Sequence, residues 1–75
     1  MLWTYQITAA SRPRVLMRLV QVFDQQCLVI RSLTLSLLDD HVSIAVTIEV
    51  EPGQAHRVRA KLCNQIDIQN VEMYL

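Results

Sequence analysis

Two runs of alternating apolar and polar residues, separated by a short acidic segment, constrain the fold of this chain more than any other feature. The first run lies within residues 28–38 and has a leucine at every second position from 33 to 37. In the second run, residues 42–50, every second residue is valine or isoleucine. A period of two is typical of a strand with one buried face, and Asp39–Asp40 has the composition of a turn. The segment therefore predicts an antiparallel β-hairpin.

Two further segments show the same alternation and predict two more strands. They cover residues 2–8 and residues 69–75, at the two ends of the chain. After the first of them, Ser11 stands where a helix cap belongs, and Pro13 suits the first turn of a helix that runs to about Gln26.

Apolar residues at helical spacing predict two helices, one on each side of the hairpin. Pro52–Gly53 ends the third strand and precedes the second helix. The inward positions are Val15, Leu16, Leu19, Val20 and Phe23 in the first helix, and Ala55, Val58, Leu62 and Ile66 in the second. The order strand, helix, strand, strand, helix, strand predicts an α+β, ferredoxin-like βαββαβ sandwich. It has a four-stranded antiparallel sheet with both helices on one face.

Composition narrows the function of this single domain, residues 1–75. Hydrophobic residues make up 52% of the chain, more than one small core can hide, which indicates a partner surface. Seven Lys/Arg balance seven Asp/Glu, so the charge favours no nucleic-acid partner. No apolar run is long enough for a membrane span and no signal peptide is evident, so we expect a cytoplasmic protein.

The residue types that carry catalysis are sparse and scattered, so the sequence predicts a protein that is not an enzyme. His41 and His56 have no evident cysteine or carboxylate partner, and no glycine-rich loop is present to hold phosphate. Cys27 and Cys63 lie too far apart for a metal knuckle or a redox pair, and we expect two reduced thiols in the core. We therefore expect no catalytic, cofactor-binding or metal-binding residues.

The segment RPRVLMRLVQVFDQQCLVIRSLTL resembles the ACT domain of the regulatory small subunit of acetolactate synthase (acetohydroxyacid synthase). The Val15–Leu16 pair, Phe23 and the run Ile30–Thr34 match that family in order and spacing. Leu62 and Asp67 fit the pattern that leads from the family's second helix into the last strand. The short form of the chain is similar to the isozyme II type.

The resemblance implies a non-catalytic regulatory subunit in branched-chain amino acid biosynthesis, the route to isoleucine and valine. Such a subunit binds and activates the large catalytic subunit, which holds thiamine diphosphate, Mg²⁺ and FAD, so none of these cofactors is expected on this chain. The resemblance also implies a homodimer through sheet-edge pairing. Candidate contacts with the large subunit are four exposed arginines, namely Arg12, Arg14, Arg18 and Arg31.

In this family, amino-acid effectors bind where the first loop and helix meet the neighbouring protomer. The corresponding positions here are Ser11, Arg14, Val15, Leu28, Val29 and Ile30. Effector-binding members carry Asn at position 11, Gly at 14 and Asn at 29, and Cys27 also replaces a Gly. Because an Arg fills the space that Gly leaves open, we expect activation of the enzyme without sensitivity to valine. The alternative is that Arg14 supplies a new contact to a carboxylate.

A second function is compatible with the same sequence. The chain is then a free-standing ACT module that senses another amino acid or small ligand for a different partner.

Overall fold

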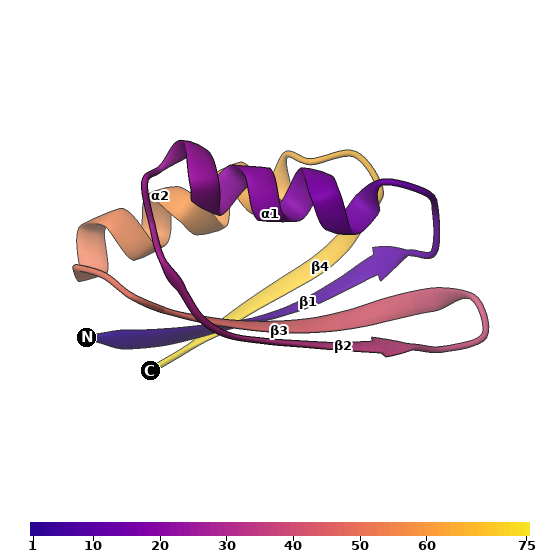
Figure 1. The fold of residues 1–75 in the computed structure, drawn as a ribbon, viewed down its shortest axis with the longest axis horizontal. Coiled ribbons are helices and arrows are strands. Elements are labelled where there is room, and N and C mark those ends of the chain that lie inside the picture. Colours follow the sequence, from indigo (N-terminus) through magenta and orange to yellow (C-terminus); the bar gives the residue numbers. More distant parts are fainter.

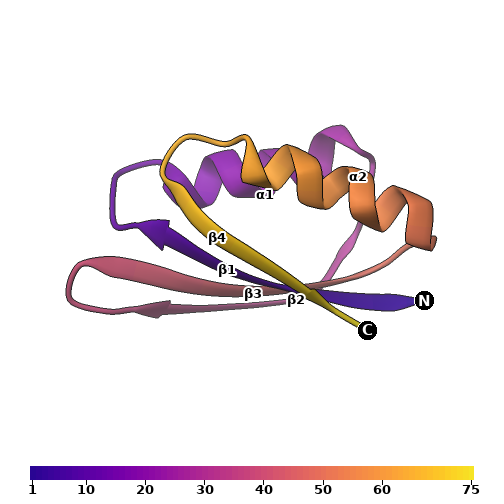
Figure 2. The same cartoon turned by 180° about the vertical axis from the view of Figure 1, so that it is seen from behind.

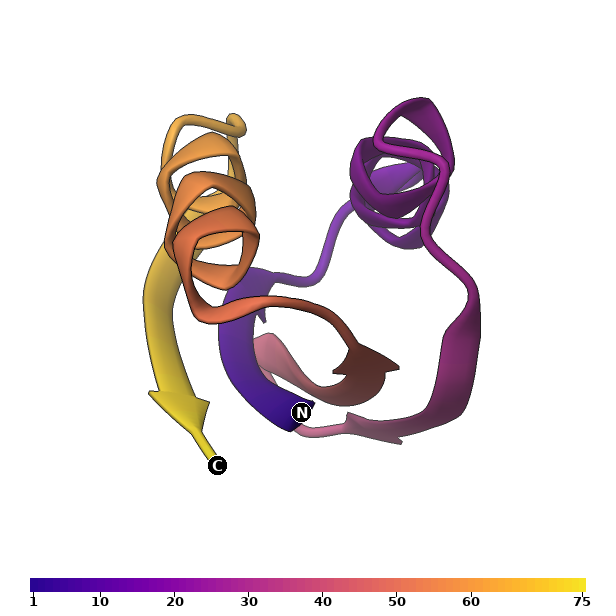
Figure 3. The same ribbon diagram turned by 90° about the vertical axis from the view of Figure 1, so that its left-hand side faces the viewer.

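The structure, a computed structural model, describes residues 1–75 and shows the six predicted elements in the predicted order. The strands are β1 (Leu2–Ala10), β2 (Ile30–Leu37), β3 (His41–Glu49) and β4 (Ile68–Tyr74), and the helices are α1 (Val15–Gln25) and α2 (Pro52–Cys63). The strands form one antiparallel sheet in the order β2-β3-β1-β4. Both helices lie on the same face of this sheet (Figure 1, and end-on in Figure 3), so the predicted ferredoxin-like sandwich is confirmed.

The core lies between the sheet and the helices and is built by the two central strands. Tyr5 and Ile7 of β1 lie directly opposite Val46 and Ile44 of β3, and all four are fully buried. The Tyr5 ring meets Phe23 of α1 edge-on, with ring centroids 5.8 Å apart. The Tyr5 hydroxyl donates a hydrogen bond of 2.7 Å to the carbonyl oxygen of Ala55, which ties the sheet to α2.

Helix α1 begins three residues later than predicted. The prediction that Ser11 caps the helix is wrong, because Arg14 is the N-cap and has left-handed backbone geometry with φ 71°. The chain therefore turns at Arg14 before helical geometry can start. The buried stripe is Val15, Leu19, Val22 and Phe23, so Val22 takes the place predicted for Leu16 and Val20. This i, i+4, i+7, i+8 stripe is narrower than the predicted one.

Helix α2 also differs in detail from the prediction. Pro52 occupies its first turn, so Pro52–Gly53 opens the helix as well as following β3. Proline suits this position because its missing N–H would have no partner there. Ile66 was expected on the buried face, but it lies beyond the end of α2 and is 70% exposed.

Both cysteines are free, as predicted, but the prediction that they lie in the core is wrong, because both are exposed. Cys27 closes the C-terminal end of α1. Its N–H donates to the Asp24 carbonyl at 2.9 Å, and the Leu28 N–H donates to the Phe23 carbonyl at 3.0 Å. This pair of bonds is the Schellman motif, whose left-handed position usually holds glycine. Cys27 occupies that position with φ 59°.

Replacing Cys27 with glycine should stabilise the protein by about 1 kcal/mol, because a side chain in left-handed geometry costs roughly that much. Urea unfolding followed by circular dichroism measures the change. Cys27→Ala is the matched control, because it removes the thiol but keeps a Cβ atom at the strained position. Equal stability of the two variants would contradict the prediction.

No helix covers the sheet face away from α1 and α2 (Figure 2). Thr4 and Thr47 share a hydrogen bond of 2.9 Å between their hydroxyls, and the Gln6 amide donates to the Ser43 hydroxyl at 2.6 Å. These cross-strand pairs hold β1 to β3 on the solvent side. Neither α1 nor α2 has the length and apolar character needed to cross a membrane.

Candidate functional site

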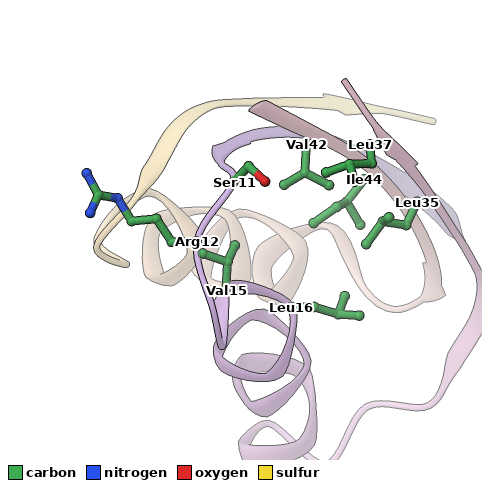
Figure 4. A pocket seen from close by; sticks show the side chains of 8 residues that line it. All are labelled: Ser11, Arg12, Val15, Leu16, Leu35, Leu37, Val42 and Ile44. Carbon is green, nitrogen blue, oxygen red and sulfur yellow. The ribbon is translucent and has the colours of Figure 1, made fainter. Parts of the chain in front are cut away.

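A cavity of about 180 Å³ lies between the start of α1 and the β2–β3 hairpin (Figure 4). We call it the α1–β2 pocket. Six of its eight lining residues are hydrophobic. The lining consists of Ser11, Arg12, Val15, Leu16, Leu35, Leu37, Val42 and Ile44.

The alternating pattern of the hairpin explains the apolar lining. Leu35 and Leu37 lie directly opposite Ile44 and Val42, so all four side chains point to the helix side of the sheet. The first turn of α1 adds the side chains of Val15 and Leu16, which line the pocket opposite the sheet. Because α1 does not cover β2, the outer part of this lining stays open: Leu35 is 41% exposed and Leu37 is 70% exposed.

The polar groups at the rim of the pocket do not provide a charged binding group inside it. The Arg12 guanidinium points away from the apolar side chains (Figure 4). Its Nε lies 3.2 Å from Asp67 Oδ1, and Arg18 lies 3.6 Å from the other oxygen of the same carboxylate. Ser11 contributes a small hydroxyl at the rim. The pocket therefore suits an aliphatic group and lacks a cation directed at a ligand carboxylate.

The structure separates the six positions that the resemblance assigned to effector binding. Ser11 and Val15 line the α1–β2 pocket, and Arg14 lies between them as the helix N-cap. Leu28, Val29 and Ile30 follow the opposite end of α1. A helix of 11 residues stands between the two groups, a length of about 16 Å at 1.5 Å per residue. Within one copy of the chain, the six positions do not form one site.

Two positions where the resemblance expects glycine have the backbone geometry that glycine favours. Arg14 has φ 71° and Cys27 has φ 59°. Positive φ is uncommon for residues with a side chain, and only three residues of this chain show it, the third being Asp67. At both positions the backbone has the geometry that a glycine of the family would favour, although this chain carries a residue with a side chain there.

Most residues of the pocket were not predicted to form a site, although the signal was present in the sequence. Leu35, Leu37, Val42 and Ile44 were assigned only to the buried faces of two strands. Their alternation placed them on one face, but it did not show that α1 leaves β2 uncovered. That depends on where the helix lies over the sheet.

The other chemistry-bearing residues lie apart from the pocket. His41 was expected to have no carboxylate partner, but its Nδ1 lies 2.8 Å from Asp40 Oδ1 at the exposed tip of the hairpin. This hydrogen bond, with the charge of His41, lowers the pKa of Asp40. His56 meets the Trp3 ring edge-on at 6.0 Å, and the buried Trp3 Nε1 has no hydrogen-bond partner. A second cavity, of about 120 Å³, lies beside Cys63 and β4.

No family model matches the sequence, and no curated protein matches it. Solved structures do share its fold. The ACT domain from GTP pyrophosphokinase of Chlorobium tepidum superposes with a TM-score of 0.86 at 17% identity, covering 99% of this chain and 97% of that chain. The small subunit of acetolactate synthase from Thermotoga maritima gives a TM-score of 0.86 at 11% identity, covering 97% of this chain and 47% of that chain.

The regulatory subunit of aspartate kinase from Thermus thermophilus is also similar, with a TM-score of 0.79 at 8% identity. The chain covers 50% of that subunit, so it spans about half the length of this protein and of the acetolactate synthase subunit. At such identities the likeness concerns the fold alone. The chain has the ferredoxin-like fold of ACT domains.

Proposed function

We propose that this chain is a non-catalytic regulatory subunit that binds and activates the large subunit of acetolactate synthase. The observation that carries the proposal is the position in the fold of the segment that resembles this family. Residues 12–35 cover the loop before α1, all of α1, the turn after it and most of β2. Both aligned glycine positions in this segment, Arg14 and Cys27, have left-handed backbone geometry.

The proposal includes insensitivity to valine. An amino-acid effector needs a partner for its carboxylate, and the Arg12 guanidinium is turned toward Asp67 instead. The family's glycine at position 14 would leave backbone N–H groups open to a carboxylate, whereas Arg14 carries a long side chain there. The cofactors of the reaction belong to the large subunit in this proposal, and both proteins act in the cytoplasm.

The α1–β2 pocket favours a second candidate function. Its six hydrophobic residues could hold the side chain of an aliphatic ligand, as a free-standing sensor for another partner requires. The two functions differ in whether acetolactate synthase responds to the chain.

Reconstitution tests the proposal. The purified chain is mixed with the acetolactate synthase large subunit of the same organism, and acetolactate formation is followed with and without valine. We expect activation that valine does not reverse. Activation that valine inhibits would keep the partner and overturn the insensitivity, and no activation and no complex would favour the free-standing sensor.

A matched variant tests the reason for the insensitivity. Arg14→Gly with Val29→Asn restores two residues that the resemblance assigns to effector binding. If the lost contacts cause the insensitivity, this variant should activate the enzyme and also respond to valine. Calorimetric titration of the unaltered chain with valine should show no binding, and micromolar binding would contradict the proposal.

A further inference from the structure

Charge is distributed unevenly between the two layers of the protein, although the net charge is zero. The helix side, residues 11–29 and 50–67, holds six of the seven Lys/Arg and three of the seven Asp/Glu, a net charge of +3. The strands and the hairpin tip hold the remaining one Lys/Arg and four Asp/Glu, a net charge of −3. The two layers therefore present surfaces of opposite charge.

Helix α2 holds three of the cations that no carboxylate neutralises. It contains Arg57, Arg59 and Lys61 and no acidic residue, and all three cations are exposed. The Lys/Arg ion pairs of the chain involve arginines of α1, the loop before it and β2. The cations of α2 thus remain available to a partner.

Two of these cations form a row along α2. Arg57 and Lys61 are four residues apart, so they lie on the same side of the helix. Lys61 alone suits the last turn, where the helix dipole is negative, but Arg57 adds a like charge at a spacing that weakens a helix. The pair therefore does not serve the stability of α2. Arg59 lies on another side and donates a hydrogen bond of 3.4 Å to the Val71 carbonyl of β4.

Short side chains occupy the outermost positions of α2. At 3.6 residues per turn, Gly53, Ala60 and Asn64 lie opposite the three buried residues of the helix, and all of them are exposed. Arg57 borders this row, because its Nη1 lies 3.8 Å from the position that a Cβ atom of residue 53 would take. The outer side of α2 is uncovered (Figure 3). We call this row, with Arg57 and Lys61, the α2 surface.

We infer that the α2 surface docks an acidic helix of the enzyme partner, with two carboxylates one turn apart that face Arg57 and Lys61. Residues four apart are separated by about 6 Å along either helix, so the two pairs of charges match. The short side chains of the row let the two helix axes approach to the usual distance of about 8–10 Å. The inference rests on the proposed function for the identity of the partner, but the chemistry of the surface does not depend on it.

The inferred contact differs from the one that the resemblance suggested. Three of the four arginines suggested there already have carboxylate partners within this chain. Arg12 and Arg18 share Asp67, and Arg31 pairs with Glu49 at 2.9 Å. A partner would have to compete with these carboxylates, whereas Arg57 and Lys61 are free of such competition.

The α2 surface suits a protein better than a nucleic acid. Proteins that bind DNA through its backbone commonly make about 6–10 phosphate contacts, and this surface offers two cations. Helix α2 also has no Phe, Tyr or Trp on which a base can stack. The acidic charge of the sheet side further disfavours a polyanion that wraps around the protein.

Charge reversal on two sides of one helix tests the inference. Arg57→Glu and Arg59→Glu change the same residue type by the same charge, but only Arg57 belongs to the α2 surface. Calorimetric titration measures the affinity of each variant for the acetolactate synthase large subunit of the same organism. We expect Arg57→Glu to weaken binding at least about tenfold and Arg59→Glu less than about threefold. Equal losses would overturn the inference.

The same variants separate docking from folding. Arg57→Glu places a carboxylate four residues before Lys61, a spacing that favours a helix, so the urea midpoint should not fall. Adding Lys61→Glu should weaken binding at least about a hundredfold. Binding of the unaltered chain should also weaken about tenfold between about 50 and about 500 mM NaCl. An affinity that does not change with salt would contradict docking through charge.

A probe that does not depend on the enzyme keeps this result apart from the proposed function. Poly-L-glutamate is titrated into the isotope-labelled chain, and the backbone amides are followed by NMR. We expect the largest shifts at residues 57–64, and their loss in the variant that combines Arg57→Glu and Lys61→Glu. Largest shifts elsewhere, or tighter binding of a single-stranded DNA oligonucleotide, would overturn the acidic helix as the occupant. If poly-L-glutamate gives the expected shifts but the large subunit does not bind, the proposed function fails and the α2 surface stands.

Discussion

Truncating Phe23 to alanine is expected to lower the free energy of unfolding by about 3–5 kcal/mol, the usual cost of emptying a large buried aromatic site. Phe23 is fully buried in α1, and its ring packs edge-on against Tyr5 at 5.8 Å. It also supplies the carbonyl that accepts the Leu28 N–H at the end of the helix. A domain of this size has only about 4–11 kcal/mol in total, so the variant loses a large share of its stability.

Urea unfolding followed by the fluorescence of Trp3, the one tryptophan, measures this loss. Met17→Ala is the control, because Met17 lies on the same helix but is 62% exposed. It should change the free energy of unfolding by no more than about 0.5 kcal/mol. Similar losses in the two variants would show that α1 does not pack as the structure describes.

Stability is expected to fall steeply at alkaline pH because of Tyr5. Burial raises the pKa of Tyr5 from 10.0 to about 12 in the folded protein. Below pH 10, Tyr5 is protonated in both the folded and unfolded states, so its contribution is constant. Between pH 10 and about pH 12 the unfolded chain loses the proton first, which favours unfolding. At 1.36 kcal/mol per pKa unit, the loss by pH 12 is about 2–3 kcal/mol.

Urea unfolding at several pH values from 8 to 12 measures this dependence. Tyr5→Phe should remove most of it, and at pH 8 it should cost about 1 kcal/mol for the lost hydrogen bond to Ala55. Tyr74→Phe is the control, because the exposed Tyr74 bonds to Glu72 and not to the core. If the Tyr5→Phe variant still lost stability at alkaline pH, groups other than Tyr5 would be the cause.

The candidate site shows which of its residues could be predicted from the sequence and which could not. The resemblance located Ser11 and Val15, which line the pocket, because a loop–helix junction is a local feature of the chain. It placed Leu28, Val29 and Ile30 in the same effector site, but in a single copy they lie at the other end of α1. The length of α1 sets this separation, because its 11 helical residues extend about 16 Å.

Periodicity alone determined the elements of this protein, because burying one face of a strand or helix demands a fixed spacing of apolar residues. The alternation from Val42 to Val50 gave a central strand that is buried at every second residue. Tertiary structure decided the rest. It forced Arg14 into left-handed geometry at the turn into α1, and it moved Val22 into the core in place of Leu16. It also left the leucines of β2 uncovered, since two helices of 11 and 12 residues cover only part of a four-stranded sheet. An alternating strand shows which face is apolar, but only the packed structure shows whether anything lies against it.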